Sequence, residues 1–204
     1  MKELTDRQKQ IVQESIQIIA KKGIQGLTIK NISNAIGISE PAIYRHFKNK
    51  NDIILTIISS MTISAENEFI HIDQNNDAIN NIQTMILKHT KRFISNPSLA
   101  AIVFSEEMFN NSSILSEPVR ALMNMNQYRL KTLIEKGQKL GSIRSDIPAK
   151  QITLLITGSF RFLVSKWHIM GFEFDLEEEV NEMLLTIDKL LTNFNITFNN
   201  TQKK

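Results

Sequence analysis

Residues 28 to 47, TIKNISNAIGISEPAIYRHF, read as two short helices separated by a tight turn. Thr28 is a favourable N-cap, and isoleucines follow it at the three- and four-residue spacing of one helical face. Gly37 can end this first helix in the left-handed conformation, because it has no Cβ. Ser39 can cap a second helix, and Pro41 fits its first turn, where backbone N–H groups have no intrahelical partner. Two helices joined by a short turn that contains glycine match the helix-turn-helix pattern.

The second of these helices has an apolar face and a polar edge. Ile43 and Phe47 are four residues apart and therefore lie on one side, which we expect to face the core. At about 100° per residue, Pro41 and Arg45 then point directly away from the core. This outward ridge is free to meet another molecule.

The two flanks of the same helix carry polar side chains. Tyr44 and His46 fall about 80° either side of the buried midline. A helix in the major groove of DNA needs such a layout, with an outer ridge for base edges and flanking donors at the height of the phosphates. Lys50 begins the next helix, where Asn49 is a suitable N-cap, and a positive side chain there could grip a phosphate together with free N–H groups. The alternative is ordinary packing of two amphipathic helices with half-exposed edges.

Two further features favour contact with DNA. A helix is expected over residues 6 to 22, and its apolar stripe would complete a three-helix domain. That stripe consists of Val12, Ile16, Ile19 and Ala20. Residues 1 to 50 contain nine Lys/Arg and four Asp/Glu, a net charge of +5, whereas the remaining residues contain fifteen and seventeen, a net charge of −2. The positive charge therefore belongs to the small N-terminal unit, as binding of nucleic acid requires.

These residues resemble the N-terminal signature of the tetracycline-repressor (TetR) family of bacterial transcription regulators. The resemblance covers about 50 residues, a quarter of the chain. It is carried by Gly23, Thr28, Ile32, Ala35, Gly37-Ile38-Ser39, Tyr44, His46-Phe47, Lys50 and Ile53. Ser33 stands where the family usually has Ala, and Ile43 where it usually has Leu. Both differences are mild and leave the expected fold unchanged.

The resemblance implies an all-helical homodimer. An N-terminal DNA-binding domain would span residues 1 to 49, and a larger C-terminal domain for ligand binding and dimerisation would span residues 50 to 204. It also implies that phosphates are held by Thr28, Tyr44, His46 and Lys50. The exposed ridge that would read the bases comprises Ser39, Glu40, Pro41, Ala42 and Arg45.

Composition limits the class of protein. The 204 residues are 42% hydrophobic and 22% charged, which is enough for a core and argues against disorder. No cysteine is present, so neither a disulfide framework nor a thiolate metal site is possible. The N-terminus is polar, and the longest apolar stretch, residues 152 to 164, is too short to span a bilayer. We expect a cytoplasmic protein that does not interact with membranes.

Signatures of enzymes are absent from the sequence. The four histidines have no partner four residues away that would form a zinc-binding helix, and no glycine-rich phosphate loop or G-x-S-x-G motif occurs. We therefore expect no catalytic residues, no metal and no cofactor, although a small-molecule effector is compatible with the sequence.

The rest of the chain is also helical. The pattern predicts about nine helices in all and no strand, with one continuous helix starting near Lys50 and joining the two domains. Three further helices are expected from Glu117-Pro118 to Lys139, from Gln151 to Met170, and from Leu176 to Phe194. The last of these carries Val180, Leu184, Ile187, Leu190 and Leu191 on one stripe.

The last two helices are the candidates for a homodimer interface. Their apolar faces are wide for terminal elements, and two helices from each subunit would form a four-helix seam. A twofold dimer would also place two reading helices one turn of DNA apart, roughly 34 Å, on a palindrome. The alternative is that both helices complete the core of the monomer.

Soft and aromatic side chains gather in the middle helices and could line a cavity for an apolar small molecule. The candidates are Met61, Phe93, Phe104, Met108, Met123, Tyr128, Phe160, Arg161 and Trp167. Arg161 lies in an apolar helix that reads as buried, so its charge needs a partner. Glu106 or Glu107 would be a structural partner, and an anionic ligand group is the functional alternative.

Two classes of function follow. The first is a ligand-responsive repressor that binds a palindromic double-stranded DNA operator as a dimer. The second is a helical nucleoid or cell-division factor that binds DNA without a small-molecule inducer. No residue pattern supports an all-helical enzyme.

Overall fold

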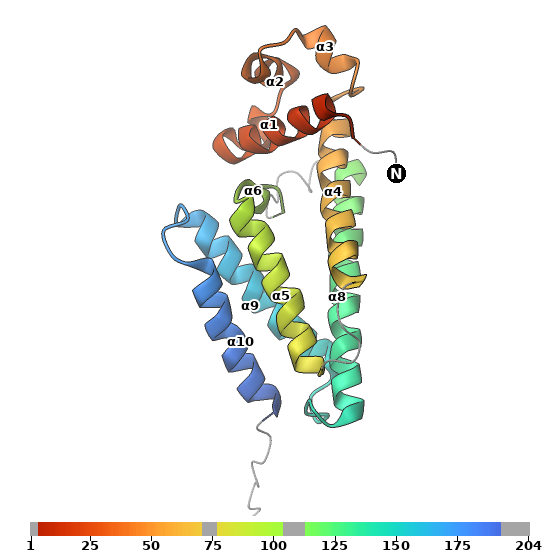
Figure 1. Ribbon diagram of the computed structural model, residues 1–204, viewed down its shortest axis with the longest axis vertical. Coiled ribbons are helices and arrows are strands. Elements are labelled where there is room, and N and C mark those ends of the chain that lie inside the picture. The colour runs from red at the N-terminus through yellow and green to blue at the C-terminus, as the bar shows by residue number, and fades with distance from the viewer. Residues whose placement is uncertain (1–3, 71–76, 104–112, 193–204) are drawn as a thin grey trace, which may run out of the picture.

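The computed structural model describes residues 4–70, 77–103 and 113–192. Within these ranges all regular structure is helical, with nine α-helices, one short 3-10 helix (Ile24–Gly26) and no strand. This confirms the predicted fold class. Figure 1 shows a three-helix unit at one end of an elongated molecule and a helical bundle that fills the rest.

The three-helix unit consists of α1 (Asp6–Lys22), α2 (Ile29–Ile36) and α3 (Glu40–Tyr44). Thr28 caps α2 as predicted, because its hydroxyl accepts a hydrogen bond from the backbone N–H of Asn31 at 3.1 Å. Gly37 ends α2 in the left-handed conformation, with φ of 75°. The helices enclose the fully buried side chains of Ile11, Ile32 and Ile43.

The next helix, α4 (Lys50–Ile70), runs without interruption from the three-helix unit into the bundle, as expected. Asn49 begins it, since its side-chain oxygen accepts a hydrogen bond from the N–H of Asp52 at 3.0 Å. The carboxylate of Asp52 in turn accepts one from the N–H of Lys48 at 3.1 Å. These reciprocal bonds fix the direction in which the chain leaves the three-helix unit.

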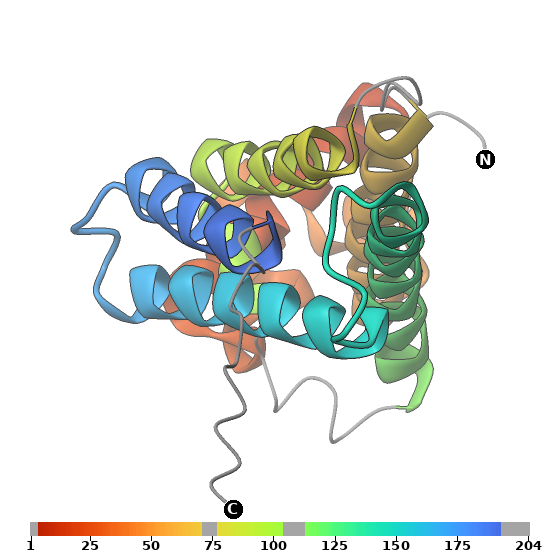
Figure 2. The same ribbon diagram turned by 90° about the horizontal axis from the view of Figure 1, so that it is seen from below.

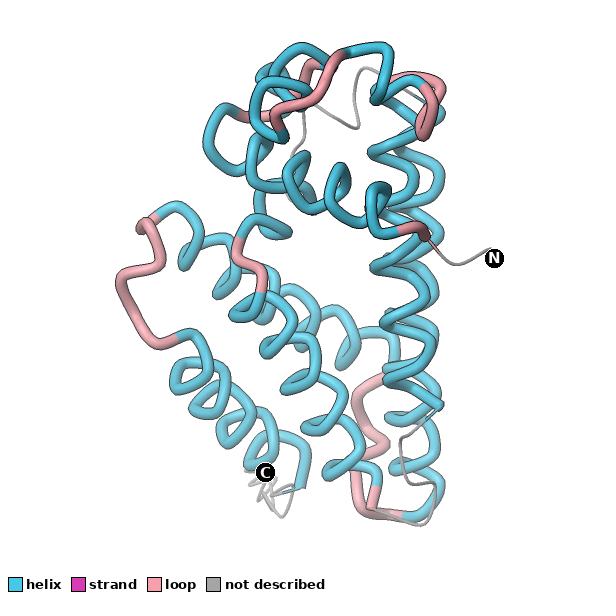
Figure 3. Tube along the Cα trace, turned by 45° about the horizontal axis from the view of Figure 1, so that its top comes forward, coloured by secondary structure: helices cyan, strands magenta, loops and turns pink. Residues whose placement is uncertain are grey.

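The bundle consists of α4, α5 (Ala78–Ser95), α6 (Ser98–Val103), α8 (Ser113–Leu140), α9 (Ala149–Ile169) and α10 (Leu176–Thr192). Seen from below, α4 and α8 lie side by side, and α5, α10 and α9 enclose the opposite side (Figure 2). The short loops lie at the ends of the helices (Figure 3). Helix α6 packs on α1 and also on α9, so it joins the bundle to the three-helix unit.

The predicted starts of two helices differ from the structure, and one of them is α9, which begins at Ala149 rather than at Gln151. Helix α8 begins at Ser113 rather than at Glu117, and Pro118 lies inside it. A proline this close to the start removes one backbone hydrogen bond near an exposed helix end, so the helix tolerates it. On the predicted apolar stripe of α10, Leu190 is exposed, whereas Leu184 and Leu191 are buried. The described part of α10 ends at Thr192, so its predicted extension to Phe194 lies outside the described residues.

Candidate nucleic-acid interface and internal cavity

Helix α3 presents the ridge that the sequence predicted. Ile43 is completely buried and Phe47 is 3% exposed, whereas Tyr44 is 52% exposed. Pro41 and Arg45 are exposed. Although α3 ends at Tyr44, the backbone of Arg45 is still helical, with φ of −71° and ψ of −20°, so the outward direction continues through this residue.

The start of α3 leaves a hydroxyl available. Ser39 occupies the N-cap position and is exposed, but its side chain makes no capping hydrogen bond, which corrects the predicted cap. Pro41 has no N–H to offer, and the N–H of Ala42 already donates to the backbone carbonyl of Ser39 at 2.9 Å. Glu40 is exposed and Ala42 is half-buried, so the ridge also contains an acidic side chain.

The predicted phosphate-binding residues lie at or beside the ends of α2, α3 and α4. Thr28 and Tyr44 are exposed, and His46 and Lys50 are half-buried. The backbone carbonyl of His46 accepts a hydrogen bond from the side-chain amide of Gln8 at 3.4 Å, which ties the end of α3 to the start of α1. The structure thus brings the four residues to the surface of one small domain, and their contacts with DNA stay a prediction.

The bundle encloses a cavity of about 280 Å³ between α4, α5, α6, α8 and α9. Most of its lining is apolar and includes residues from all five helices. Five of the candidates from the sequence line it: Met61, Phe93, Met123, Phe160 and Arg161. Phe104 and Met108 lie outside the described residues.

Tyr128 and Trp167 do not line this cavity. Tyr128 is 70% exposed on the outside of α8. Trp167 is buried at the other end of α9, where its indole N–H donates to the carbonyl of Phe174 at 3.0 Å and its ring packs on Phe172 with centroids 4.6 Å apart. Helical spacing places both residues among apolar neighbours, but it does not indicate which neighbouring helix each one meets.

Arg161 is exposed and lines the cavity from α9, where the sequence suggested a buried charge. The side chain therefore keeps contact with water, and the strong requirement for a buried partner does not apply. Its two predicted partners, Glu106 and Glu107, lie outside the described residues.

One end of the cavity is polar, which sequence reasoning missed. His89 and Asn126 line both the main cavity and a small neighbouring pocket, called the extension below, that Lys88 and Arg129 also line. Burial lowers the pKa of His89 from 6.5 to about 3, with smaller contributions from the positive charges of Arg92 and Arg129. The imidazole is therefore neutral at neutral pH. The available signal was the three-residue spacing that places His89 beside Arg92 on α5, and Asn126 beside Arg129 on α8.

A helix-turn-helix unit with an outward ridge, joined by a continuous helix to a bundle that encloses a cavity, defines a DNA-binding protein with a separate ligand-binding domain. Comparison with known proteins agrees. Residues 11–57 match the model of bacterial regulatory proteins of the tetR family, and residues 78–193 match the tetracyclin repressor-like C-terminal domain. The chain belongs to the TetR family, and it is a DNA-binding, ligand-responsive regulator of transcription. The alternative of a nucleoid or division factor has no support among these matches.

Several relatives match along most of their length. The fatty acid metabolism regulator protein of Bacillus subtilis is 23% identical over 185 residues, which cover 90% of this chain and 95% of the relative. The transcriptional repressor AcnR of Corynebacterium glutamicum is 22% identical over 152 residues, or 71% and 72% of the two chains. Both are named as regulators rather than enzymes.

Solved structures share the fold. The fatty acid degradation regulator FadR of Bacillus halodurans superposes with a TM-score of 0.81 at 19% identity, covering 92% of this chain and 97% of that one. FadR of Bacillus subtilis, solved in complex with stearoyl-CoA, gives 0.76 at 22% identity, covering 88% and 96%.

In the part of the chain that the structure describes, no helix has the length and apolar character needed to cross a membrane. Within the same ranges, no group of His, Asp and Glu side chains is arranged to hold a metal ion.

Proposed function

We propose that the protein is a repressor that binds a palindromic operator as a homodimer and is released by an amphiphilic small molecule bound in the cavity. The exposed ridge of α3 carries this proposal, because a helix must be exposed on the surface to enter the major groove. We place the division between the DNA-binding domain and the effector domain at the start of α4, at Lys50. The cytoplasmic location expected from the sequence stays a prediction.

In the proposed complex, the ridge of α3 contacts base edges, and the residues on its flanks contact the phosphates of the DNA backbone. Arg45 can donate two hydrogen bonds to a guanine, the commonest specific contact in the major groove. Thr28, Tyr44 and His46 would donate to phosphates, and Lys50 would add a positive charge at the start of α4. The hydroxyl of Ser39, which makes no capping hydrogen bond, would donate a hydrogen bond to a base or a phosphate.

The proposed dimer forms through α9 and α10. Leu155, Phe162 and Ile169 recur every seven residues on α9 and are 61%, 66% and 79% exposed. Such a stripe is unfavourable in water unless another apolar surface covers it. Beside it runs a groove between α9 and α10 that includes Phe162 and Met183, into which side chains of a partner could insert. A seven-residue repeat is typical of helices that pack along their length.

The proposed effector has an apolar chain. The cavity is lined mainly by apolar side chains. The Bacillus subtilis regulator, which is 22% identical in structure comparison, binds stearoyl-CoA. We infer from these two observations that this chain responds to a fatty acid or an acyl derivative.

The response would pass through α4 and α6. Ile58 and Met61 of α4 line the cavity, and the same helix begins at Lys50, next to the three-helix unit that contains α3. Ile102 of α6 also lines the cavity, and α6 packs on α1. A ligand that fits one position of these helices better than another changes the separation of the two α3 helices in the dimer. A ligand with equal affinity for both positions would not change the equilibrium between them.

Selection of bound genomic fragments tests this function. The purified dimer should enrich a small number of palindromic sites in front of genes, and its affinity should fall by roughly 10³ to 10⁵ between 50 and 200 mM salt if it makes six to ten phosphate contacts. Adding an acyl ligand should release the fragments. Binding at many dispersed sites without a shared palindrome would contradict regulation of specific genes.

A further inference from the structure

The polar end of the cavity suggests which part of an effector lies there. His89 of α5 and Asn126 of α8 line both the main cavity and its small extension, so they stand where the two spaces meet. The extension is also lined by Ala65 and Phe69 of α4, by Met85 and Lys88 of α5, and by Arg129 of α8. A ligand that enters the apolar cavity and reaches this end therefore meets polar groups last.

Arg129 of α8 supplies a positive charge at this end. Its guanidinium lies 4.8 Å from the centre of the Phe69 ring, and its Nη1 donates to the carbonyl of Ala65 at 3.1 Å. Within the described part of the chain this is its single hydrogen bond, and no carboxylate is paired with it. The stacking and the hydrogen bond hold the guanidinium in place while other N–H donors stay available.

Asn126 has unused hydrogen-bonding capacity. Its side-chain oxygen is buried and has no hydrogen-bond partner among the described residues. A buried amide oxygen without a partner is costly, so a polar ligand group at this position would be stabilised. Rotation of the amide exchanges its oxygen and nitrogen, so Asn126 can donate to an anion as well as accept from a hydroxyl group.

His89 is compatible with an anion at this position. His89 is half-buried and faces the cavity, and the nearby positive charges of Arg92 and Arg129 add to burial in lowering its pKa. A neutral imidazole can donate one hydrogen bond to a ligand oxygen. Its ring lies 6.5 Å from that of Phe160, which belongs to the apolar part of the cavity.

We propose that His89, Asn126 and Arg129 bind the carboxylate of an effector whose apolar chain extends through the cavity toward α6 and α9. This inference rests on the proposed function, because it names the chemical class of the effector and its direction in the same cavity. It predicts that a free acid binds with its head group inside the protein. An acyl-CoA, whose head group is far larger, would instead leave that group at the open side near Arg161.

Binding of three probes of matched chain length to the full-length protein tests this inference: decanoate, decanol and decanoyl-CoA, each measured by isothermal titration calorimetry. Decanoate should bind more tightly than decanol. Arg129→Met should weaken decanoate binding about tenfold to a hundredfold, the effect of losing a charge-assisted hydrogen bond, and leave decanol binding unchanged.

Two further variants separate the head-group role from general damage. Arg120→Met is the matched control on α8, because Arg120 is exposed, pairs with Glu117 at 3.2 Å and does not line the cavity. It should bind decanoate like the wild type. Asn126→Leu covers the case in which Arg129→Met unfolds, since Asn126 holds no other described residue through its oxygen. It should also lose affinity for decanoate relative to decanol.

Four results would overturn the inference. Equal affinity of decanoate and decanol would show that this end does not recognise charge. Loss of binding in Arg161→Met, with Arg129→Met and Asn126→Leu unaffected, would place the head group at the open side. If decanoyl-CoA bound and decanoate did not, the buried carboxylate site would be refuted. The proposal that the cavity binds the effector would still hold. If the wild type bound none of the probes, both the head-group site and an acyl effector would be wrong, whereas operator binding would be unaffected.

Discussion

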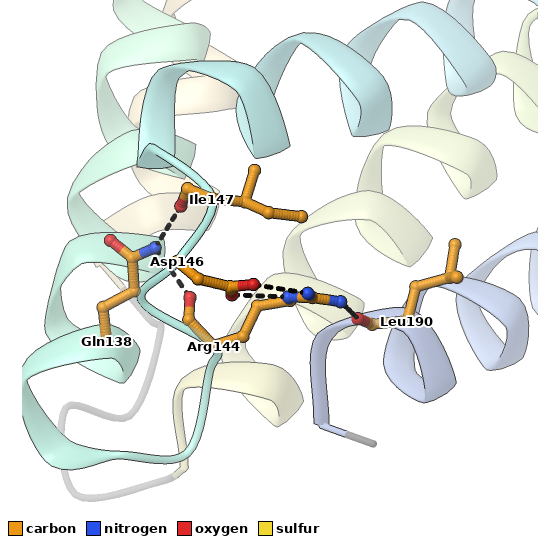
Figure 4. Close-up of polar contacts among 5 residues, drawn as sticks. All are labelled: Gln138, Arg144, Asp146, Ile147 and Leu190. Carbon is orange, nitrogen blue, oxygen red and sulfur yellow. Dashed lines mark hydrogen bonds and ion pairs between the residues drawn. The ribbon is translucent and has the colours of Figure 1, made fainter. Parts of the chain in front are cut away.

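The guanidinium of Arg144 is paired with both oxygens of the Asp146 carboxylate, at 2.7 Å from Nε to Oδ1 and 2.6 Å from Nη2 to Oδ2 (Figure 4). The third nitrogen, Nη1, donates to the carbonyl of Leu190 at 3.2 Å, and the backbone N–H of Arg144 donates to the carbonyl of Leu191 at 3.0 Å. Gln138 holds the same loop by donating to the carbonyls of Arg144 and Ile147. The loop between α8 and α9 therefore caps the last turn of α10, where a positive charge favours the helix dipole.

The first prediction concerns this cap. Asp146→Asn removes the carboxylate that orients Arg144, so the amides in the last turn of α10 should exchange with solvent faster, while α1 to α3 keep their protection. Hydrogen exchange followed by mass spectrometry measures both regions. Lys150→Asn, an exposed change close by, is the control. Unchanged exchange in α10 would show that Asp146 does not contribute to the cap.

The stability that this cap gives to the end of α10 should also depend on pH. The hydrogen bond from Arg144 is the main reason that the pKa of Asp146 lies below its usual 3.8. A carboxylate whose pKa is lower in the folded protein stabilises it above the unfolded value and loses that contribution as the pH falls through the folded value. We therefore expect protection of α10 to decrease below about pH 4 in the wild type. In Asp146→Asn this step should be absent.

The second prediction separates reading of bases from contact with the backbone. Lys50→Ala should weaken binding to all sequences alike and lower the slope of log affinity against log salt by about 1. Arg45→Ala should cost about 1–3 kcal/mol at one position of the operator and relax the preference there. Fluorescence anisotropy with the operator and its single-base variants measures both. An unchanged salt slope in Lys50→Ala would refute its phosphate contact.

The third prediction concerns the apolar stripe on α9. Phe162→Glu places a charge where we expect the partner subunit and should weaken the dimer by about 2 kcal/mol or more. Sedimentation velocity over a range of concentrations would detect the shift toward monomer. Tyr128→Glu is the control, because Tyr128 is equally exposed but lies on the outside of α8. If only Tyr128→Glu dissociated the dimer, the interface would be on α8.

Local sequence rules predicted much of the fold. The capping residues Thr28 and Asn49 and the turn at Gly37 were correct, because each is determined by neighbours within a few residues. The continuous α4 followed from its uninterrupted apolar pattern. These signals involve only residues close together in the sequence, so a single sequence is enough to recognise them.

Features that depend on other helices were harder to predict. Arg161 was expected to be buried because its helix is apolar, but part of that apolar surface is the exposed stripe of α9. The polar end of the cavity combines His89 with Asn126, which come together only when α5 packs on α8. No pattern within either helix indicates that packing. The assignment of contacts across helices therefore requires the structure.

The fourth prediction concerns the turn that orients the reading helix. Gly37 has φ of 75°, and a Cβ added to it would meet no atom within 4 Å, so a substitution there is strained by the backbone and not by crowding. Gly37→Ala should destabilise the protein by about 1–2 kcal/mol, whereas Gly37→Asn should cost less because asparagine tolerates the left-handed conformation. Urea unfolding measures the difference, and operator affinity of the folded variants shows whether α3 keeps its direction. Equal stability of both variants would mean that the turn relaxes out of the left-handed conformation.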